Sequence, residues 1–507
     1  MYNNFKLTIF EDSLFEKPGK NQLLISDIQS PTPLYPVPSH RQLRWHTHEF
    51  YGFLHFGLNT FTDKEWGYGD ESPELFAPTN FDADQIASTA NEVGMSGLIL
   101  TCKHHDGFCL WPSRYTDHSV KSSPWKGGQG DVVAEMADAC QRYDILFGVY
   151  LSPWDRNHAE YGRPAYLEYY RKQLIELTTE YGDLFEVWFD GANGGDGYYG
   201  GVREQRRIDR RTYYDWENTW KIVRQNQPDA VMFSDVGPDV RWVGNENGIA
   251  GAPCWSTLST AGLYPGFGGD DWTTELETDM VQAWASDQQM LNQGYRQGDS
   301  WLPAECDVSI RPGWFYHSSE DDKVKSAETL LDLYFKSVGR GASLLLNIPP
   351  DKTGQFHPND VQNLQEFRRL REQIFSRDLT STAHIEANNI RGNSHRFSAQ
   401  NLVDNNTDTY WSTDDNISEA EVIFEFQNTV SFNTISIREY LPLGQRVDNF
   451  TLEIEKGGVW QSYYRGTAIG NLCLVREQKC STQKIRFRCK SNFVCPAISE
   501  FKVYLAP

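Results

Sequence analysis

Short apolar runs alternate with amphipathic stretches from about residue 45 to residue 350, a pattern typical of repeated strand–helix units around a parallel sheet. Within one amphipathic stretch, Val132, Val133, Met136 and Ala139 recur at three- and four-residue spacing, which predicts a helix with one core-facing side. The predicted strands are residues 53–56, 97–101, 145–151, 185–189, 231–233 and 343–348. The predicted helices are residues 83–93, 132–143, 164–181, 211–227 and 324–338.

This alternation predicts an α/β fold, a (β/α)₈ TIM-like barrel. The alternative is a doubly wound open sheet, which usually carries a glycine-rich phosphate loop after its first strand. No such loop is present in the sequence. Polar and aromatic residues instead gather just after the strand runs, where a barrel places its active site.

The pattern changes after about residue 380 to short alternating runs at 422–426, 434–437, 450–454 and 484–488. Alternation with frequent turns predicts an antiparallel β-sandwich, or jelly roll. We therefore expect an N-terminal extension at 1–44, a barrel at 45–375 and a sandwich at 383–507.

Length and charge narrow the classes of function. A chain of 507 residues is too long for one hydrophobic core. Its net charge of −22 argues against nucleic acid as a partner, because nucleic-acid binding needs a basic face. No apolar stretch long enough for membrane insertion and no signal peptide are visible, so the compartment stays open between cytoplasmic and, if a signal peptide was removed, secreted or periplasmic.

Nine cysteines form no CxxC pair, so the sequence suggests neither a disulfide framework nor a zinc site. Four of them lie near the C-terminus: Cys473, Cys480, Cys489 and Cys495. Buried free thiols are favoured there over one disulfide between strands.

The strand ends carry a dense set of polar and aromatic groups. His104 and His105 are adjacent and lack the spacing that aims two imidazoles at one zinc ion, and no GxSxG elbow supports a serine nucleophile. Neutral imidazoles can donate to and accept from hydroxyl groups while an indole packs on the apolar face of a sugar ring. The set therefore favours a carbohydrate ligand.

Glycoside hydrolysis needs two carboxyl groups, one of them ionised. Asp190 suits the ionised role, because it ends an apolar strand, follows Trp188 and precedes Gly191, which lets a sugar approach closely. The alternative role as a helix cap is weakened because residues 191–197 have the composition of a loop.

Five motifs together resemble the α-L-fucosidases of glycoside hydrolase family 29: His55-Phe-Gly, Glu65-Trp, Lys103-His-His-Asp-Gly-Phe, Tyr150-Leu-Ser-Pro-Trp-Asp and Val187-Trp-Phe-Asp-Gly. The resemblance covers about residues 45 to 350. It implies that Asp190 is the catalytic nucleophile. It also implies a fucose pocket lined by His55, Glu65, Trp66, His104, His105, Tyr150 and Trp188.

The catalytic acid/base is less well marked. Glu246 lies in the segment that begins at Arg241 and resembles the acid/base loop of the subfamily restricted to α-1,3- and α-1,4-linked fucose. Glu305, beside another strand-like run, is the competing candidate. The same subfamily resemblance implies that Arg241 and Trp314 belong to the substrate site.

The run 401–412 resembles the opening of discoidin-type modules of carbohydrate-binding family 32. This resemblance implies a structural Ca²⁺ held by Asp404, Thr409 and Glu500, and oxygen ligands on a tight loop suit that ion. The alternative is an Asx-rich turn without an ion. No cofactor is expected for catalysis.

The expected function is that of a retaining exo-α-L-fucosidase that removes α-1,3/1,4-linked fucose from Lewis-type glycans by double displacement. Fucosylated glycans are then its partners, and protein partners are undetermined. Two alternatives remain: an inactive, lectin-like barrel that binds fucose, and another retaining barrel glycosidase such as an α-galactosidase or a hexosaminidase.

Overall fold

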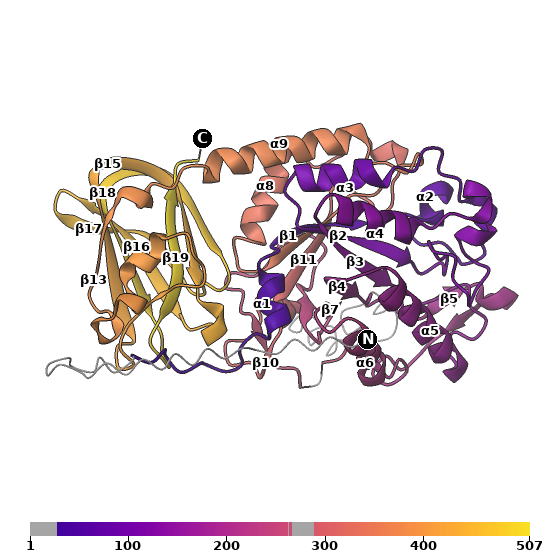
Figure 1. Ribbon diagram of the computed structural model, residues 1–507, viewed down its shortest axis with the longest axis horizontal. Helices are drawn as coiled ribbons and strands as arrows, with labels where there is room; N and C mark the ends of the chain where they lie inside the picture. The colour runs from indigo at the N-terminus through magenta and orange to yellow at the C-terminus, as the bar shows by residue number, and fades with distance from the viewer. Residues whose placement is uncertain (1–27, 262, 266–287, 507) are drawn as a thin grey trace, which may run out of the picture. The chain divides into compact units, whose positions relative to one another are not determined.

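A computed structural model describes residues 28–261, 263–265 and 288–506 of the chain (Figure 1). Residues 1–27 of the predicted N-terminal extension lie outside the described residues. The remainder of that extension leads into helix α1 (His40–His46), which continues two residues past the predicted boundary at 44 and whose N-cap Ser39 accepts a hydrogen bond from the backbone N–H of Gln42.

The first architectural unit is a closed barrel of eight parallel strands, in the order β1-β12-β11-β8-β7-β4-β3-β2, which confirms the predicted fold. Six strands match the predicted runs within a few residues. The barrel strands are β1 (Phe50–Leu54), β2 (Gly97–Lys103), β3 (Leu146–Leu151), β4 (Glu186–Trp188), β7 (Val231–Ser234), β8 (Val240–Trp242), β11 (Ala304–Ser309) and β12 (Ser343–Asn347).

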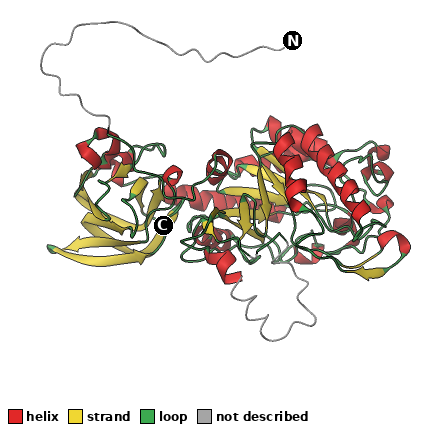
Figure 2. Ribbon diagram, turned by 90° about the horizontal axis from the view of Figure 1, so that it is seen from below, coloured by secondary structure: helices red, strands yellow, loops and turns green. Residues whose placement is uncertain are grey.

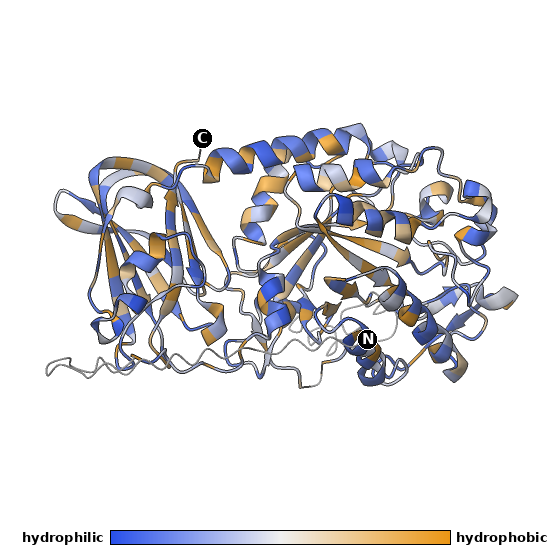
Figure 3. Cartoon of the chain, in the orientation of Figure 1, coloured by the Kyte–Doolittle hydropathy of each residue, from blue (hydrophilic) through white to orange (hydrophobic). Residues whose placement is uncertain are grey.

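The predicted helices lie along the outside of the strands (Figures 1 and 2). They are α3 (Ala83–Glu92), α4 (Val132–Arg142), α5 (Pro164–Glu180), α6 (Trp216–Asn226) and α8 (Ala327–Lys336). Two further helices are α2 (Leu58–Thr62), which follows β1, and α9 (Pro358–Phe375), which follows β12. In α4 the predicted stripe of Val132, Val133, Met136 and Ala139 is buried. The strands are largely hydrophobic, whereas α9 carries many hydrophilic positions (Figure 3).

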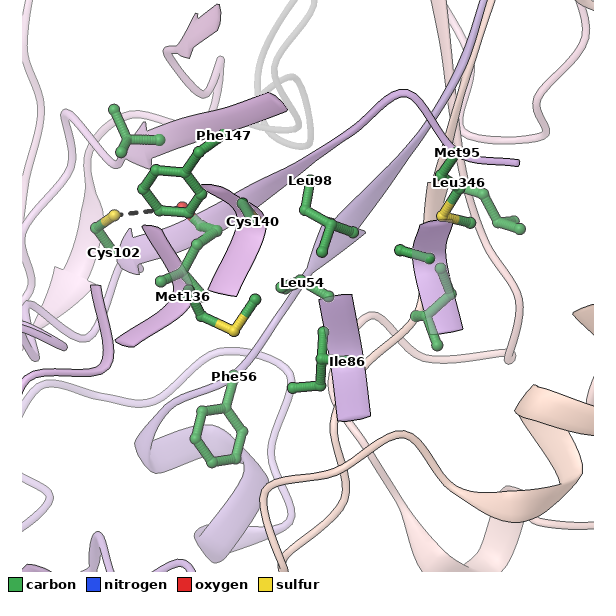
Figure 4. Close-up of a cluster of buried hydrophobic side chains, with 14 of the residues drawn as sticks. Leu54, Phe56, Ile86, Met95, Leu98, Cys102, Met136, Cys140, Phe147 and Leu346 are labelled. Carbon is green, nitrogen blue, oxygen red and sulfur yellow. Dashed lines mark hydrogen bonds between the residues drawn. The ribbon is translucent and has the colours of Figure 1, made fainter. Parts of the chain in front are cut away.

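The layer between strands and helices forms the main core of the barrel. Met136 of α4 and Ile86 of α3 lie in one buried cluster with Leu54 and Leu98 of strands β1 and β2 (Figure 4). Because these side chains fill the outer layer, the inner faces and the strand ends are left for polar and aromatic groups.

The second unit is an antiparallel sheet whose strands form the predicted sandwich. The runs 422–426 and 434–437 belong to one 21-residue strand with register shifts between them, so the expectation of two separate strands is corrected. Such irregularities bend a strand and let one chain segment serve both layers. The strands are β13 (His384–Ala387), β14 (Trp411–Ser412), β15 (Glu419–Glu439), β16 (Asn449–Lys456), β17 (Val459–Gly466), β18 (Cys473–Lys490) and β19 (Ala497–Tyr504).

All nine cysteines are free and all except Cys480 are buried, in agreement with the expectation of buried thiols. In the described part of the chain, no helix has both the length and the apolar character that crossing a bilayer requires.

Candidate active site

A pocket opens at the carboxyl ends of the barrel strands and brings together most of the predicted site residues. Its wall is formed by Phe53, His55, Glu65, Trp66, His104, His105, Trp188, Asp190, Gly191, Ala192, Phe233, Asp235, Trp242, Glu246, Asp307 and Trp314. Parallel strands point their carboxyl ends to one face of a barrel, which explains how residues from position 53 to position 314 meet here.

Asp190 follows β4 and is held in place by two donors. Its Oδ1 accepts from the backbone N–H of Ala192 at 2.6 Å, and its Oδ2 accepts from the Tyr150 hydroxyl at 3.0 Å. Burial raises the pKa of Asp190 to about 7, although both hydrogen bonds act in the opposite direction. A Cβ atom on Gly191 would lie 2.5 Å from the Asp235 carboxylate, so a larger residue beside Asp190 would require Asp235 to move.

Three histidines of the pocket are neutral. Burial lowers the pKa of His55 and His105 to about 3 and that of His104 well below its usual range. The neutral form leaves one donor and one acceptor nitrogen on each ring, which suits recognition of sugar hydroxyl groups.

The hydrogen-bond partners assign the tautomers. His55 Nδ1 lies 2.9 Å from Asn347 Oδ1, and His105 Nδ1 lies 2.7 Å from the Ser152 hydroxyl, which itself donates to a carbonyl. Both rings therefore carry the proton on Nδ1 and offer Nε2 as an acceptor. His104 Nδ1 instead faces the side-chain amide of Asn59 at 3.4 Å, which leaves its Nε2 as a donor.

Aromatic side chains form the floor and one wall. Trp188 stacks on Phe233 with ring centroids 4.1 Å apart and on Tyr150 at 5.3 Å. Trp66 is 41% exposed and meets the edge of His105 at 5.1 Å. Tyr150 was expected to line the pocket but is fully buried behind its surface. Its hydroxyl donates a hydrogen bond to Asp190.

The two candidates for the acid/base lie at different depths. Glu246 lines the pocket and its Oε2 accepts from the indole N–H of Trp314 at 3.2 Å. Glu305 is fully buried in the barrel interior, where Tyr51 and Trp188 donate to its carboxylate. The geometry therefore favours Glu246.

Arg241 does not lie in the pocket, which corrects its expected role in substrate binding. Its guanidinium is fully buried and donates to the backbone carbonyls of Leu291 and Trp255 at 2.8 and 2.9 Å. These bonds fix the segment that follows β8, and the side chain has no face toward a ligand.

The sequence interpretation missed two carboxyl groups of the pocket, Asp235 and Asp307. Asp235 directly follows β7, just as Asp190 closely follows β4, so the same positional rule would have identified it. Asp307 lies two residues beyond Glu305 on β11, on the same inward face but nearer the open end. Burial and the neighbouring Glu246 and Glu305 raise the pKa of Asp307 well above its usual range.

The predicted calcium ligands do not offer a free set of oxygens. Asp404 accepts from the Thr409 hydroxyl at 2.6 Å, which is the geometry of a turn closed on itself. Glu500 is paired with Arg438 at 3.0 Å and with Lys502 at 2.6 Å. Two cations already neutralise this carboxylate, so the described side chains do not fit a calcium ion as they stand, and the ion remains a prediction.

A barrel whose strand ends unite several carboxyl groups, neutral histidines and indole rings in one pocket has the groups that a glycoside hydrolase needs. Comparison with known proteins identifies the family. The alpha-L-fucosidase family model matches residues 34–248 and 269–370, and the F5/8 type C domain model matches residues 381–501. The chain belongs to the alpha-L-fucosidase family, glycoside hydrolase family 29, and is an enzyme of that family.

Relatives in plants and bacteria match nearly the whole chain. Alpha-L-fucosidase 1 of Arabidopsis thaliana is 44% identical over 88% of this chain and 83% of its own length. The structure of a putative alpha-L-fucosidase from Bacteroides thetaiotaomicron has a TM-score of 0.82 and 38% identity and covers 94% of this chain and 99% of its own. A family 29 fucosidase of Ruminococcus gnavus in complex with fucose has a TM-score of 0.83 and 30% identity, over 96% and 98% of the two chains.

Proposed function

We propose that the protein is a retaining exo-α-L-fucosidase in which Asp190 is the nucleophile and Glu246 the acid/base. The observation that carries the proposal is the presence of both carboxyl groups in one pocket at the barrel's carboxyl-terminal face. A relative whose structure was solved in complex with fucose shares this fold across almost the entire chain. Fucosylated glycans are accordingly the proposed substrates.

The reaction proceeds in two displacements. The Asp190 carboxylate attacks the anomeric carbon of fucose while Glu246 gives its proton to the departing glycosidic oxygen, so a fucosyl–enzyme ester forms and the aglycone leaves. Glu246, now ionised, removes a proton from water, and the resulting attack releases fucose and frees Asp190. Two inversions give net retention.

Neighbouring groups support each role. Tyr150 and the Ala192 N–H hold the attacking oxygen atoms in place, and Trp314 orients the Glu246 carboxyl through its indole N–H. The neutral imidazoles of His55, His104 and His105 supply both donors and acceptors for the sugar hydroxyl groups. Trp188 and Trp66 offer apolar surface to the ring.

Azide rescue separates the two carboxyl roles. In Asp190→Ala, azide replaces the missing nucleophile and should give β-fucosyl azide from an activated aryl α-L-fucoside. In Glu246→Ala, azide attacks the fucosyl–enzyme and should give α-fucosyl azide. NMR identifies the anomer. Glu305→Gln serves as the comparison, and an α-azide product from that variant alone would transfer the acid/base role to Glu305.

We further propose a preference for α-1,3- and α-1,4-linked fucose of Lewis-type glycans. The segment around Glu246 and the neighbouring Trp314 support it, because both resemble the subfamily with this restriction. A panel of α-1,2-, α-1,3-, α-1,4- and α-1,6-fucosylated oligosaccharides tests it by fucose release. Equal rates on all four linkages, or activity confined to aryl fucosides, would contradict the preference.

A further inference from the structure

The imidazole of His317 lies between two carboxylates at the rim of the pocket. Its Nδ1 is 2.7 Å from Asp63 Oδ1, and its Nε2 is 2.7 Å from Glu65 Oε1. A neutral imidazole carries one N–H and could donate to only one of these acceptors. Two contacts of this length therefore require the doubly protonated ring, in which each nitrogen donates to one carboxylate.

Glu65 in turn holds the loop that contains His317. Its Oε2 accepts from the backbone N–H of Trp314 at 2.8 Å, and its Oε1 accepts from that of Phe315 at 3.2 Å. The loop is closely built around this carboxylate, since a Cβ atom on Gly313 would lie 2.6 Å from Glu65 Oε1 and 2.9 Å from the His317 ring. Three donors from one loop thus converge on a single side chain.

The same loop carries a wall of the pocket. The Trp314 side chain lines the pocket, and its indole N–H reaches Glu246 at 3.2 Å. A displacement of Glu65 would therefore move the wall that contacts both the ligand and the proposed acid/base. His317 itself does not line the pocket, so it acts on the pocket through Glu65 and through the loop that it shares with Trp314.

We propose that His317 is a positioning residue whose doubly protonated ring fixes Glu65 and the Trp314 loop in the geometry that binds the sugar. Loss of one proton from His317 releases one of its two carboxylates and lowers affinity for substrate. The proposal rests on the proposed function of the pocket.

The charges around His317 define the direction of the pH effect. Burial lowers the pKa of His317, but its hydrogen bonds with Asp63 and Glu65 outweigh burial and bring it above the ordinary value of about 6.5. Glu320, which accepts from the Gly313 N–H, adds negative charge nearby, whereas Lys352 acts on Asp63 in the opposite sense. The two hydrogen bonds from the doubly protonated His317 ring to Asp63 and Glu65 are present together below the pKa of His317. One of them is lost as pH rises through that pKa.

Steady-state kinetics from about pH 6 to about pH 9 test the proposal. KM of the wild-type enzyme should rise about threefold to tenfold across the titration of His317 while kcat changes less, because one partly exposed, charge-assisted contact is lost. In His317→Gln, KM at about pH 6 should already be higher than that of the wild type. It should then stay constant as pH rises, because the amide does not titrate. In Asp63→Asn, the rise should begin at lower pH.

His384→Gln is the matched control, since His384 is exposed on β13. NMR titration of ¹³C-labelled histidine, with the His317 signal assigned from His317→Gln, gives a readout that needs no activity. If the proposed fucosidase function fails, the wild type and every variant will lack turnover. The NMR titration would still test whether the His317 ring is doubly protonated between Asp63 and Glu65. A His317 pKa at or below 6.5, or a KM profile in His317→Gln identical to that of wild type, overturns the proposal.

Discussion

At the scale of single residues, the environment of Asp190 decides when the proposed nucleophile is ionised. Burial raises its pKa to about 7, and the Tyr150 hydroxyl and the Ala192 N–H lower it from what burial alone would give. Asp235 and Glu246 add like charge that also raises it. The Asp190 carboxyl group thus changes between its neutral and ionised forms near pH 7 and is not permanently charged.

This environment predicts the acid limb of the pH profile. Since only the ionised form attacks, kcat/KM should fall about tenfold per pH unit below about 7. Tyr150→Phe removes a donor that favours the carboxylate, so the limb should move to higher pH. Measurement of kcat/KM from about pH 4 to about pH 8 checks both expectations. Tyr115→Phe, at an exposed tyrosine, should keep the wild-type profile, and a Tyr150→Phe limb at lower pH would contradict the role of this hydrogen bond.

Single residues also show what the sequence could and could not predict. Asp190 was predicted correctly to lie in the pocket, because a motif and a strand end coincide there. The contact of His317 with Glu65 joins positions 252 residues apart, so no local pattern marks it. Arg241 was placed wrongly because proximity to Glu246 along the chain does not show toward which side a side chain points.

At the scale of elements, the two barrel strands that the sequence did not predict are β8 and β11. β8 has only three residues, and β11 carries Glu305 and Asp307 on its inward face. Polar residues on that face break the apolar signature of a buried parallel strand. The helices were predicted more closely, because their outward faces stay polar wherever the active site lies.

Two glutamates from separate strands are buried together in the barrel interior. Glu186 of β4 and Glu305 of β11 are both fully buried, and burial together with the charge of Glu305 raises the pKa of Glu186 well above its usual range. A group with a raised folded-state pKa stabilises the fold below its unfolded pKa of about 4.3, and this contribution is lost as pH rises toward the folded value. The wild-type protein should therefore lose stability between about pH 5 and about pH 8.

Glu186→Gln should remove part of this loss, by about 1–3 kcal/mol, because the amide does not ionise. Chemical unfolding at the two pH values measures it. The exposed Glu477→Gln variant is the control and should follow the wild type. An equal loss of stability in Glu186→Gln and wild type would show that the pair does not determine the pH dependence.

At the scale of the whole molecule, one arginine links the barrel segment to the sandwich. Arg438 of β15 pairs with Glu49, which precedes β1, at 2.6 Å and with Glu500 of β19 at 3.0 Å. Burial lowers its pKa, but the two carboxylates outweigh burial and raise it. Removal of the cation leaves Glu49 and Glu500 close to one another, with Lys502 still beside Glu500.

Arg438→Met keeps most of the aliphatic volume and removes the charge, so it should destabilise the fold by about 2–4 kcal/mol. The loss should be smaller than that from breaking a fully buried ion pair, because the Arg438 side chain keeps some exposure. The double variant Arg438→Met with Glu49→Gln should recover part of this loss, since one unpaired carboxylate disappears. Thermal unfolding by calorimetry measures both, and the exposed Arg465→Met serves as the control. Fucosidase activity at low temperature should be unchanged, because none of these residues lines the pocket. Equal melting temperatures for Arg438→Met and wild type would show that this ion pair does not stabilise the fold.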